Sequence, residues 1–354
     1  MKSMDKYRGC LLGGAVGDAL GYPIEFMTEK QILDKYGKNG ITAYSLTNGI
    51  AQISDDTQMT LFTANGLLVG AANREYIPCI SDAYSDWLLT QGENQFKDEK
   101  PLCSWLNNIK EMHHSREPGR TCIISIMNGA NGTMEKPINH SKGCGSIMRA
   151  APIGLYFENT LSAEDIDMLG AQSAALTHGH ELGYIPAAMF VHIIHTVSHN
   201  PDISLLAAIN DAKLLMPKLF PNSKHMHELI SLVDKAITLS TQSLNDFDAI
   251  RQIGEGWVAE ETLAIAIYCA LKYSDNFEKA IITSVNHSGD SDSTGSVTGN
   301  IMGAYLGLSH IPQKFIDNLE LKNVIIEIAD DLYNGYSNTD EEWQKKYYYN
   351  TMHN

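Results

Sequence analysis

The chain has 354 residues, and 26 Lys and Arg residues against 42 Asp and Glu residues give it a formal net charge of −16. With 44% apolar and 19% charged residues, it is too hydrophobic and too weakly charged for an intrinsically disordered protein. The acidic balance argues against a protein that binds nucleic-acid duplexes or anionic membranes, because both attract a basic surface.

The length allows one large domain or two smaller ones, and no shift in composition marks a linker. We therefore expect a single domain over residues 1–354, with a polar tail at about 336–354 that is a surface helix or a partner contact. Six cysteines lie scattered without a CxxC pair. The first residues already have the character of a folded segment, so we expect no signal peptide. Reduced thiols and a cytoplasmic location follow as expectations. No run of 18 apolar residues predicts a membrane span.

Hydrophobic spacing predicts helices along most of the chain. Two short apolar runs, 121–127 and 281–285, are the best strand candidates, although both could equally be buried helix. Loops are expected around 91–120 and 131–146. The pattern favours an all-α fold. The predicted helices cover residues 57–70, 183–199, 203–216, 225–240 and 257–273.

Two sets of glycines recur at every fourth position. On a helix, each set forms a stripe without side chains, at a cost of about 1 kcal/mol per glycine relative to alanine. Close approach of two helix backbones would offset that cost, so the stripes predict two tightly packed inner helices; loop glycines are the alternative. The stripes are Gly9, Gly13, Gly17 and Gly21, and Gly295, Gly299, Gly303 and Gly307.

The first acidic cluster is Ser54-Asp55-Asp56-Thr57, directly before the predicted helix 57–70. Ser54 is a suitable N-cap, which places Asp55 and Asp56 in the first turn, where the helix dipole favours negative charge. Taken alone, such a cluster is most simply a helix cap.

The second acidic cluster is Gly289-Asp290-Ser291-Asp292-Ser293-Thr294, which leads into the second glycine stripe. An EF-hand loop would require a glutamate at its twelfth position, where this chain has Ile301. A DxDxT phosphatase motif would require a buried strand ending at Asp290, and the preceding polar residues weaken that interpretation. The remaining interpretation is a site for a hard cation that is shared with the first cluster.

Four carboxylates close together would repel each other unless a cation or bound protons compensate. Carboxylate and hydroxyl oxygens suit Mg²⁺ or Mn²⁺, whereas Zn²⁺ would favour His or Cys. If the glycine helices bring the clusters face to face, two ions could be held. The predicted ligands are Ser54, Asp55, Asp56, Asp290, Asp292 and Ser293.

Three single residues outside the clusters, Glu25, Asp18 and Cys144, also have both structural and functional interpretations. Pro23 should end the first helix and leave Glu25 on a loop, where a surface salt bridge is the commoner fate of a glutamate. Asp18, within the first stripe, is expected to be a buried hydrogen-bonded group. Cys144, between Gly143 and Gly145, has no identifiable base nearby, so a loop that cradles a phosphate with its N–H groups is favoured over a nucleophile.

The histidines give weaker signals. His192, His195 and His199 share one helix face and could suggest zinc, but no acidic or cysteine partner stands at ligand spacing. A partly exposed helix face is the simpler interpretation. His178 and His180 follow a helical segment and could line a cleft.

The ordered set of motifs resembles the ADP-ribosylglycohydrolases, the family of the dinitrogenase reductase-activating glycohydrolase and the ADP-ribosylarginine and ADP-ribosylserine hydrolases. The resemblance runs from about residue 5 to about residue 310. It rests on Gly17-Asp18-Ala19-Leu20-Gly21 with Glu25, Ser54-Asp55-Asp56-Thr57-Gln58-Met59, Gly143-Cys144-Gly145-Ser146-Ile147-Met148-Arg149, Thr177-His178, Gly256-Trp257-Val258-Ala259-Glu260-Glu261, and Gly289-Asp290-Ser291-Asp292-Ser293.

The resemblance implies a dinuclear Mg²⁺ or Mn²⁺ centre in a central cleft of a helical fold, held by the six ligands given above. Serine stands at positions 54 and 293, where the family often has threonine. The 143–146 segment (Gly143, Cys144, Gly145 and Ser146) matches a stretch that contacts a diphosphate, and His178 matches a residue that lines the ADP-ribose cleft. Glu25 matches an acidic residue near the metals. We expect Asp292 or Glu25 to take a proton from the attacking water.

Three functions follow as hypotheses. The first is a hydrolase that removes ADP-ribose from a protein side chain, with arginine suggested by the Gly256–Glu261 segment. The second is an immunity or binding protein that blocks a partner ADP-ribosyltransferase with its acidic surface. The third is a hydrolase of a free ADP-ribosyl metabolite or of ADP-ribosylserine.

Overall fold

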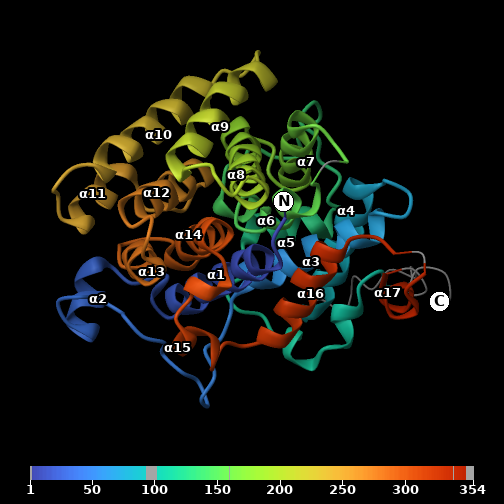
Figure 1. Ribbon diagram of the computed structural model, residues 1–354, viewed down its shortest axis with the longest axis horizontal. Helices are drawn as coiled ribbons and strands as arrows, with labels where there is room; N and C mark the ends of the chain where they lie inside the picture. Colours follow the sequence, from blue (N-terminus) through green and yellow to red (C-terminus); the bar gives the residue numbers. More distant parts are fainter. Residues whose placement is uncertain (1, 93–101, 159, 338, 348–354) are drawn as a thin grey trace.

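The computed structural model describes residues 2–92, 102–158, 160–337 and 339–347 (Figure 1). Over these residues the chain is helical, and extended pairing is limited to isolated bridges such as the one between Gly143 and Val258. The α-helices are α1 (Met4–Gly21), α2 (Glu29–Tyr36), α3 (Asp55–Gly70), α4 (Tyr76–Thr90), α5 (Arg120–Met127), α6 (Ala151–Tyr156), α7 (Ala163–Ala175), α8 (Glu181–His199), α9 (Leu205–Leu219), α10 (Met226–Ser240), α11 (Asp246–Ile253), α12 (Ala259–Lys272), α13 (Phe277–Val285), α14 (Ser291–Leu306), α15 (Gln313–Ile316), α16 (Lys322–Asn334) and α17 (Glu341–Tyr347).

Helices α1 and α14 pack against each other at the centre of the molecule (Figure 1). Their glycines meet in antiparallel order: a Cβ atom at Gly13 would lie 2.4 Å from the carbonyl oxygen of Gly299, and one at Gly17 would lie 1.9 Å from that of Gly295. No larger residue fits at these positions without moving a backbone. The predicted pair of tightly packed helices is therefore confirmed, and Gly307 caps α14 instead of lying within it.

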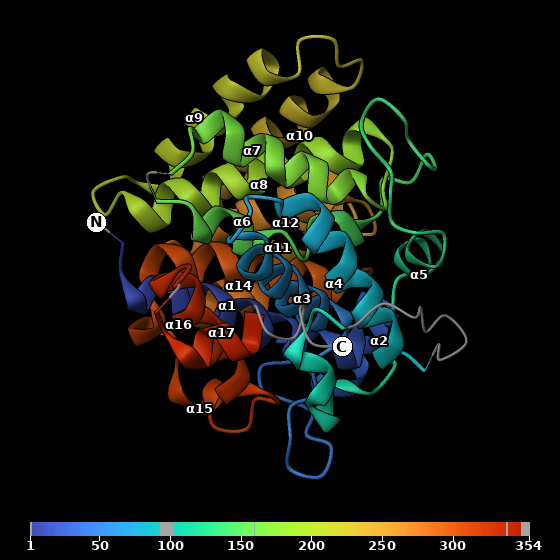
Figure 2. The same cartoon turned by 90° about the vertical axis from the view of Figure 1, so that its right-hand side faces the viewer.

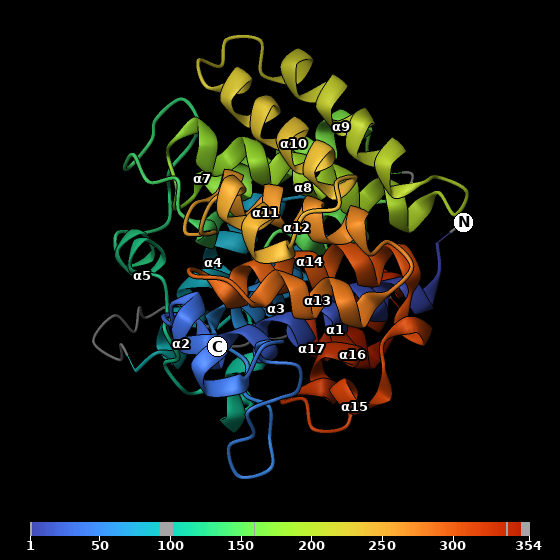
Figure 3. The ribbon, with the colours of Figure 1, turned by 90° about the vertical axis from the view of Figure 1, so that its left-hand side faces the viewer.

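The other helices enclose this pair on two sides. Figures 2 and 3 show α7 to α12 above it and α15 below it, with α16 packed alongside α1. Helix α8 packs on α7, α9, α12 and α14, whereas α3 packs on α4 and contacts both members of the pair. The ends of α1, α3 and α14 thus come together near the middle of the fold.

The predicted all-α class is confirmed, and the five predicted helices correspond to α3, α8, α9, α10 and α12. Both strand candidates are wrong, because residues 121–127 lie in α5 and residues 281–285 in α13. An apolar run of this length does not separate a strand from a buried helix. None of the described helices combines the length and the apolar character needed to cross a bilayer.

The expected loop 131–146 is irregular until a 3-10 turn, η5 (Cys144–Ser146). The expected loop 91–120 contains the short turns η3 (Trp105–Asn108) and η4 (Lys110–Met112), while residues 93–101 lie outside the described part. The tail carries α17, and its residues 338 and 348–354 are likewise outside the described part. All six cysteines are free thiols, as expected.

Candidate metal centre

The first acidic cluster lies at the start of α3. The Ser54 hydroxyl accepts a hydrogen bond from the N–H of Asp56 at 3.2 Å, so Ser54 is the N-cap that the sequence predicted. Asp55 and Asp56 occupy the first turn and are buried. Asp55 Oδ2 accepts a hydrogen bond from the N–H of Gly119 at 3.1 Å, and Asp56 Oδ2 has no hydrogen-bond partner in the described chain.

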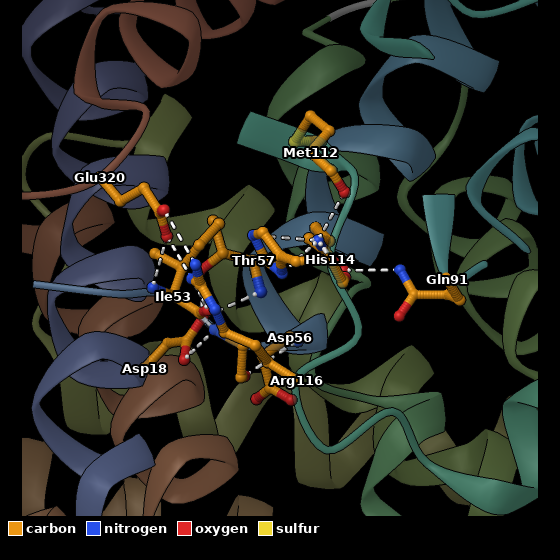
Figure 4. Close-up of polar contacts among 11 residues, drawn as sticks. Asp18, Ile53, Asp56, Thr57, Gln91, Met112, His114, Arg116 and Glu320 are labelled. Carbon is orange, nitrogen blue, oxygen red and sulfur yellow. Dashed lines mark hydrogen bonds and ion pairs between the residues drawn. The ribbon is translucent and has the colours of Figure 1, made fainter. Parts of the chain in front are cut away.

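Asp18 connects α1 to the start of α3. Its carboxylate accepts hydrogen bonds from the N–H groups of Ser54 (3.0 Å) and Thr57 (3.1 Å) and from the Thr57 hydroxyl (Figure 4). The side chain is fully buried, as the sequence predicted for a hydrogen-bonded residue in the stripe. Burial raises the pKa of Asp18 to about 6, although these hydrogen bonds act in the opposite direction. Asp18 thus fixes the position of the first cluster.

The second acidic cluster forms the start of α14. Asp290 is the N-cap, and its Oδ1 accepts a hydrogen bond from the N–H of Ser293 at 3.1 Å. Asp292 lies in the first turn and is 2% exposed. No strand precedes Asp290 in the described chain, which removes the phosphatase interpretation.

Glu25 lies directly after η1 (Tyr22–Ile24), the single turn that follows α1. Helix α1 ends at Gly21, before Pro23 as expected, although Pro23 itself lies within η1. Glu25 is only 7% exposed and so is not the surface residue that was expected. Its Oε2 has no hydrogen-bond partner in the described chain. Glu25 therefore turns inward and joins the second cluster.

The structure brings the two clusters together. Carboxylate oxygens of Glu25, Asp290 and Asp292 lie within 4.8 Å of one another. The Ser293 hydroxyl lies 3.4 Å from Oδ1 of Asp56 and joins this group to the first cluster. Two segments more than 200 residues apart thus form one buried group of oxygen atoms.

Burial and mutual repulsion make the ionised form of these carboxylates costly. Burial raises the pKa of Glu25 to about 9, and the charges of Asp290 and Asp55 add to the effect. Burial raises the pKa of Asp55 to about 8. It also raises the pKa values of Asp56 and Asp292 well above 3.8. A bound cation would relieve this cost, because it compensates the charges that repel each other.

The donor set fits a hard divalent cation. All the side-chain donors of the two clusters are carboxylate or hydroxyl oxygens, the donors that Mg²⁺ and Mn²⁺ prefer. The oxygens of Glu25 and Asp56 that lack a partner are the kind of buried polar atom that requires an explanation, and an ion would provide one. The cluster is therefore a candidate metal centre.

The 143–146 loop borders this centre. Cys144 Sγ lies 2.7 Å from Oδ2 of Asp290, a contact that the sequence analysis missed. The N–H groups of Gly143, Cys144 and Ser146 already donate to protein oxygens, among them the carbonyl of Trp257. These three groups do not form an open N–H cradle, so the loop would meet a ligand through its other atoms.

His178 is buried behind the same loop. A Cβ atom at Gly143 would lie 3.4 Å from its Nε2, and its Nδ1 lies 2.8 Å from the Thr177 hydroxyl. Burial lowers the pKa of His178 well below 6.5, so the imidazole is neutral. Arg149, fully buried, donates to the same hydroxyl at 2.5 Å and lies over the ring of Tyr84. Arg149 ends the Gly143–Arg149 motif, but nothing in the sequence pattern indicated a role for it.

The expectation of a partly exposed histidine face agrees with His195 and His199, which are half-buried, and is wrong for His192, which is 3% exposed. Its Nδ1 lies 2.8 Å from a carboxylate oxygen of Asp167, and its Nε2 lies 3.3 Å from one of Asp211. Both partners belong to other helices, so spacing along α8 could not show them. His180 is the N-cap of α8 and is only half-buried.

The fold and this site together define an all-helical protein with a buried centre of carboxylates at the meeting point of three helices. The chain belongs to the ADP-ribosylglycohydrolase family, whose model matches residues 1–342.

Several named proteins are similar along almost the whole chain. The Rhodospirillum rubrum ADP-ribosyl-[dinitrogen reductase] glycohydrolase is 25% identical over 90% of this chain and 91% of its own. The ADP-ribosylhydrolase ARH3 of Danio rerio is 24% identical over 94% and 91% of the two chains. The ADP-ribosylarginine hydrolase Tri1 of Pseudomonas putida is 24% identical over 96% of this chain and 81% of its own. A solved structure titled ADP-ribosylglycohydrolase-related protein complex shares the fold, with a TM-score of 0.60, 23% identity and coverage of 94% and 98%.

Proposed function

We propose that the protein is a metal-dependent hydrolase that cleaves the glycosidic bond between ADP-ribose and a modified protein side chain, with arginine as the linked residue. The observation that carries the proposal is the buried carboxylate cluster, with oxygens of Glu25, Asp290 and Asp292 within 4.8 Å of one another and Asp56 joined to them through the Ser293 hydroxyl. Family membership and relatives named as ADP-ribosylarginine and ADP-ribosyl-[dinitrogen reductase] hydrolases support it.

The proposed cation ligands are Ser54, Asp55, Asp56, Asp290, Asp292 and Ser293, all of them buried. Two Mg²⁺ or Mn²⁺ ions at these oxygens would orient the ribose hydroxyls and supply positive charge. Asp18 serves this arrangement by fixing the start of α3. The 143–146 loop would border the ADP-ribose, because Cys144 contacts Asp290. His178 would do the same, because it lies directly behind this loop.

Hydrolysis requires a group that takes a proton from the attacking water while positive charge develops on the ribose. Asp292 and Glu25 are the proposed proton acceptors. Glu25 has an oxygen without a hydrogen-bond partner in the described chain, so it can hold a proton without breaking an existing contact. Because the site is buried, few other water molecules would compete at the reacting carbon.

The test measures release of ADP-ribose from arginine-linked and serine-linked peptides, each with Mg²⁺ or Mn²⁺ and with excess chelator. We expect metal-dependent release from the arginine-linked peptide. Absence of hydrolysis on every linkage would contradict the proposal. Tight association with an ADP-ribosyltransferase that survives Asp292→Asn would favour the immunity-protein alternative instead.

A further inference from the structure

A hollow of about 300 Å³ is lined by residues that neighbour the carboxylate cluster in the chain. This volume is at the small end of ligand pockets, which run from about 300 to 1,000 Å³, so it suits one side chain better than a whole nucleotide. Its walls are Tyr22, Pro23, Phe26, Ser45, Thr47, Gln52 and Glu117.

Four of these lining residues stand close in the chain to residues of the cluster or to a hydrogen-bond partner of the cluster. Tyr22 and Phe26 flank Glu25 in the same turn. Gln52 lies two residues before Ser54. Glu117 lies two residues before Gly119, whose N–H donates to Asp55. The segments that line the hollow are therefore the ones that carry Glu25, lead into Ser54 and supply the hydrogen-bond partner of Asp55.

The chemistry of the walls suits a planar cation. Phe26 and Tyr22 provide aromatic rings, Glu117 provides a carboxylate, and none of the seven lining residues is basic. A guanidinium group stacks on aromatic rings and pairs with carboxylates through its planar set of N–H donors. A neutral hydroxyl side chain would use neither feature.

The residue before Glu117 is held by contacts away from the lining of the hollow. The neighbouring Arg116 donates to the carbonyl of Ile53 at 2.8 Å and pairs with Glu320 (Figure 4). The Arg116 guanidinium is thus bound to Ile53 and Glu320. It does not line the hollow, where it could pair with Glu117. Glu117 itself has a φ of 50°, a left-handed conformation that is uncommon for a residue with a side chain. Such strain persists where the surroundings fix a residue, often at a binding site.

Phe26 lines the hollow and also contacts Trp257, a neighbour of the 143–146 loop. Its ring stacks on Trp257 with a centroid distance of 5.7 Å and an interplanar angle of 20°. The carbonyl of Trp257 in turn accepts the N–H of Cys144. Phe26 thus contacts both the hollow and the residue that holds the 143–146 loop, which is proposed to border the ADP-ribose.

Building on the proposed function, we infer that this hollow receives the guanidinium group of the ADP-ribosylated arginine. Glu117 pairs with the guanidinium and Phe26 stacks on it. These two residues determine specificity for arginine and take no part in the proton transfer assigned to Glu25 and Asp292.

The experiment compares Glu117→Gln and Phe26→Leu with the wild type and with a matched control, Glu111→Gln, an exposed glutamate in the adjacent turn η4. The KM for an ADP-ribosylarginine peptide and the inhibition constant of free ADP-ribose, which lacks the guanidinium, are measured in parallel. We expect KM to rise about tenfold, equivalent to ~1.4 kcal/mol, while the inhibition constant changes less than twofold. The control should match the wild type.

If both constants rise together, or if KM stays unchanged in both variants, the assignment of the hollow is overturned. Calorimetric titration with agmatine, in the presence of ADP-ribose, separates this result from failure of the proposed function. If agmatine binding depends on Glu117 but the protein hydrolyses no linkage, the guanidinium site is supported and the proposed hydrolase function is refuted. If the protein hydrolyses a serine linkage and agmatine binding does not depend on Glu117, the hydrolase function is supported and the guanidinium site is refuted.

Discussion

The hydroxyl of Ser293 lies 3.4 Å from a carboxylate oxygen of Asp56, although 237 positions separate the two residues in the chain. Ser293 belongs to the first turn of α14 and Asp56 to the first turn of α3. Both helices begin with a side chain that caps their free N–H groups, so each acidic turn is fixed locally before the two meet. The candidate centre is the point where two capped helices converge.

Removing one carboxylate from the centre should abolish hydrolysis and preserve the fold. Asp292→Asn keeps the side-chain shape and removes a buried charge, so we expect ADP-ribose release to fall by at least about 100-fold, the lower range for a lost general base. Asp55→Ala should have the same effect on activity. Circular dichroism checks the fold, and Asp34→Asn, at an exposed position, is the control. Full activity in either variant would refute the assignment of these residues.

The metal-free protein should lose stability as the pH rises. Glu25 and Asp55 have pKa values of about 9 and about 8 in the folded chain, above 4.5 and 3.8 for the unperturbed groups. Since folding favours their protonated forms, this contribution is fully present below about pH 4 and is lost as the pH rises through 8 and 9. The melting temperature in chelator should therefore fall between pH 5 and 9.

Adding Mg²⁺ or Mn²⁺ at pH 8 should restore the melting temperature, because an ion that binds only the folded chain stabilises it. Asp292→Asn should show a shallower fall with pH and a smaller response to the ions. A melting temperature that is flat with pH, or insensitive to both ions, would contradict the model of a metal-compensated cluster.

The glycine contact between α1 and α14 predicts a stability effect. A Cβ atom at Gly17 would lie 1.9 Å from the carbonyl oxygen of Gly295, so Gly17→Ala must push the two backbones apart. We expect a loss of at least about 1–3 kcal/mol in the free energy of unfolding, measured with urea. Gly119→Ala is the matched control, because its nearest atom would be 3.8 Å away. Equal stability of the two variants would show that the helices can separate at little cost.

Asp18 should contribute to stability through its hydrogen bonds to the start of α3. Asp18→Ala leaves the buried N–H groups of Ser54 and Thr57 without their acceptor, at roughly 1–3 kcal/mol for each unpaired group. Asp18→Asn retains one oxygen acceptor and should lose less. Urea unfolding of the two variants gives the comparison. A wild-type midpoint for Asp18→Ala would mean that α3 does not depend on this anchor.

The sequence alone predicted the local features well. The spacing of apolar residues located helices such as α8 and α12, and Ser54 was identified as a cap from its position before an apolar segment. The glycine stripes predicted the contact between α1 and α14. The short apolar run 121–127 was misleading, because α5 is too brief for its period to be distinguished from that of a strand.

Helices, caps and stripes depend on residues three or four positions apart, so the sequence by itself determined them. The fate of single polar side chains was decided only by the tertiary structure: Glu25 turns inward to Asp290 and Asp292, Cys144 reaches Asp290, and His192 pairs with Asp167. These partners stand on other helices, and no local spacing encodes which helix faces will meet. Packing the whole core sets those distances, because a buried polar group gains its partner only when distant segments are held against each other.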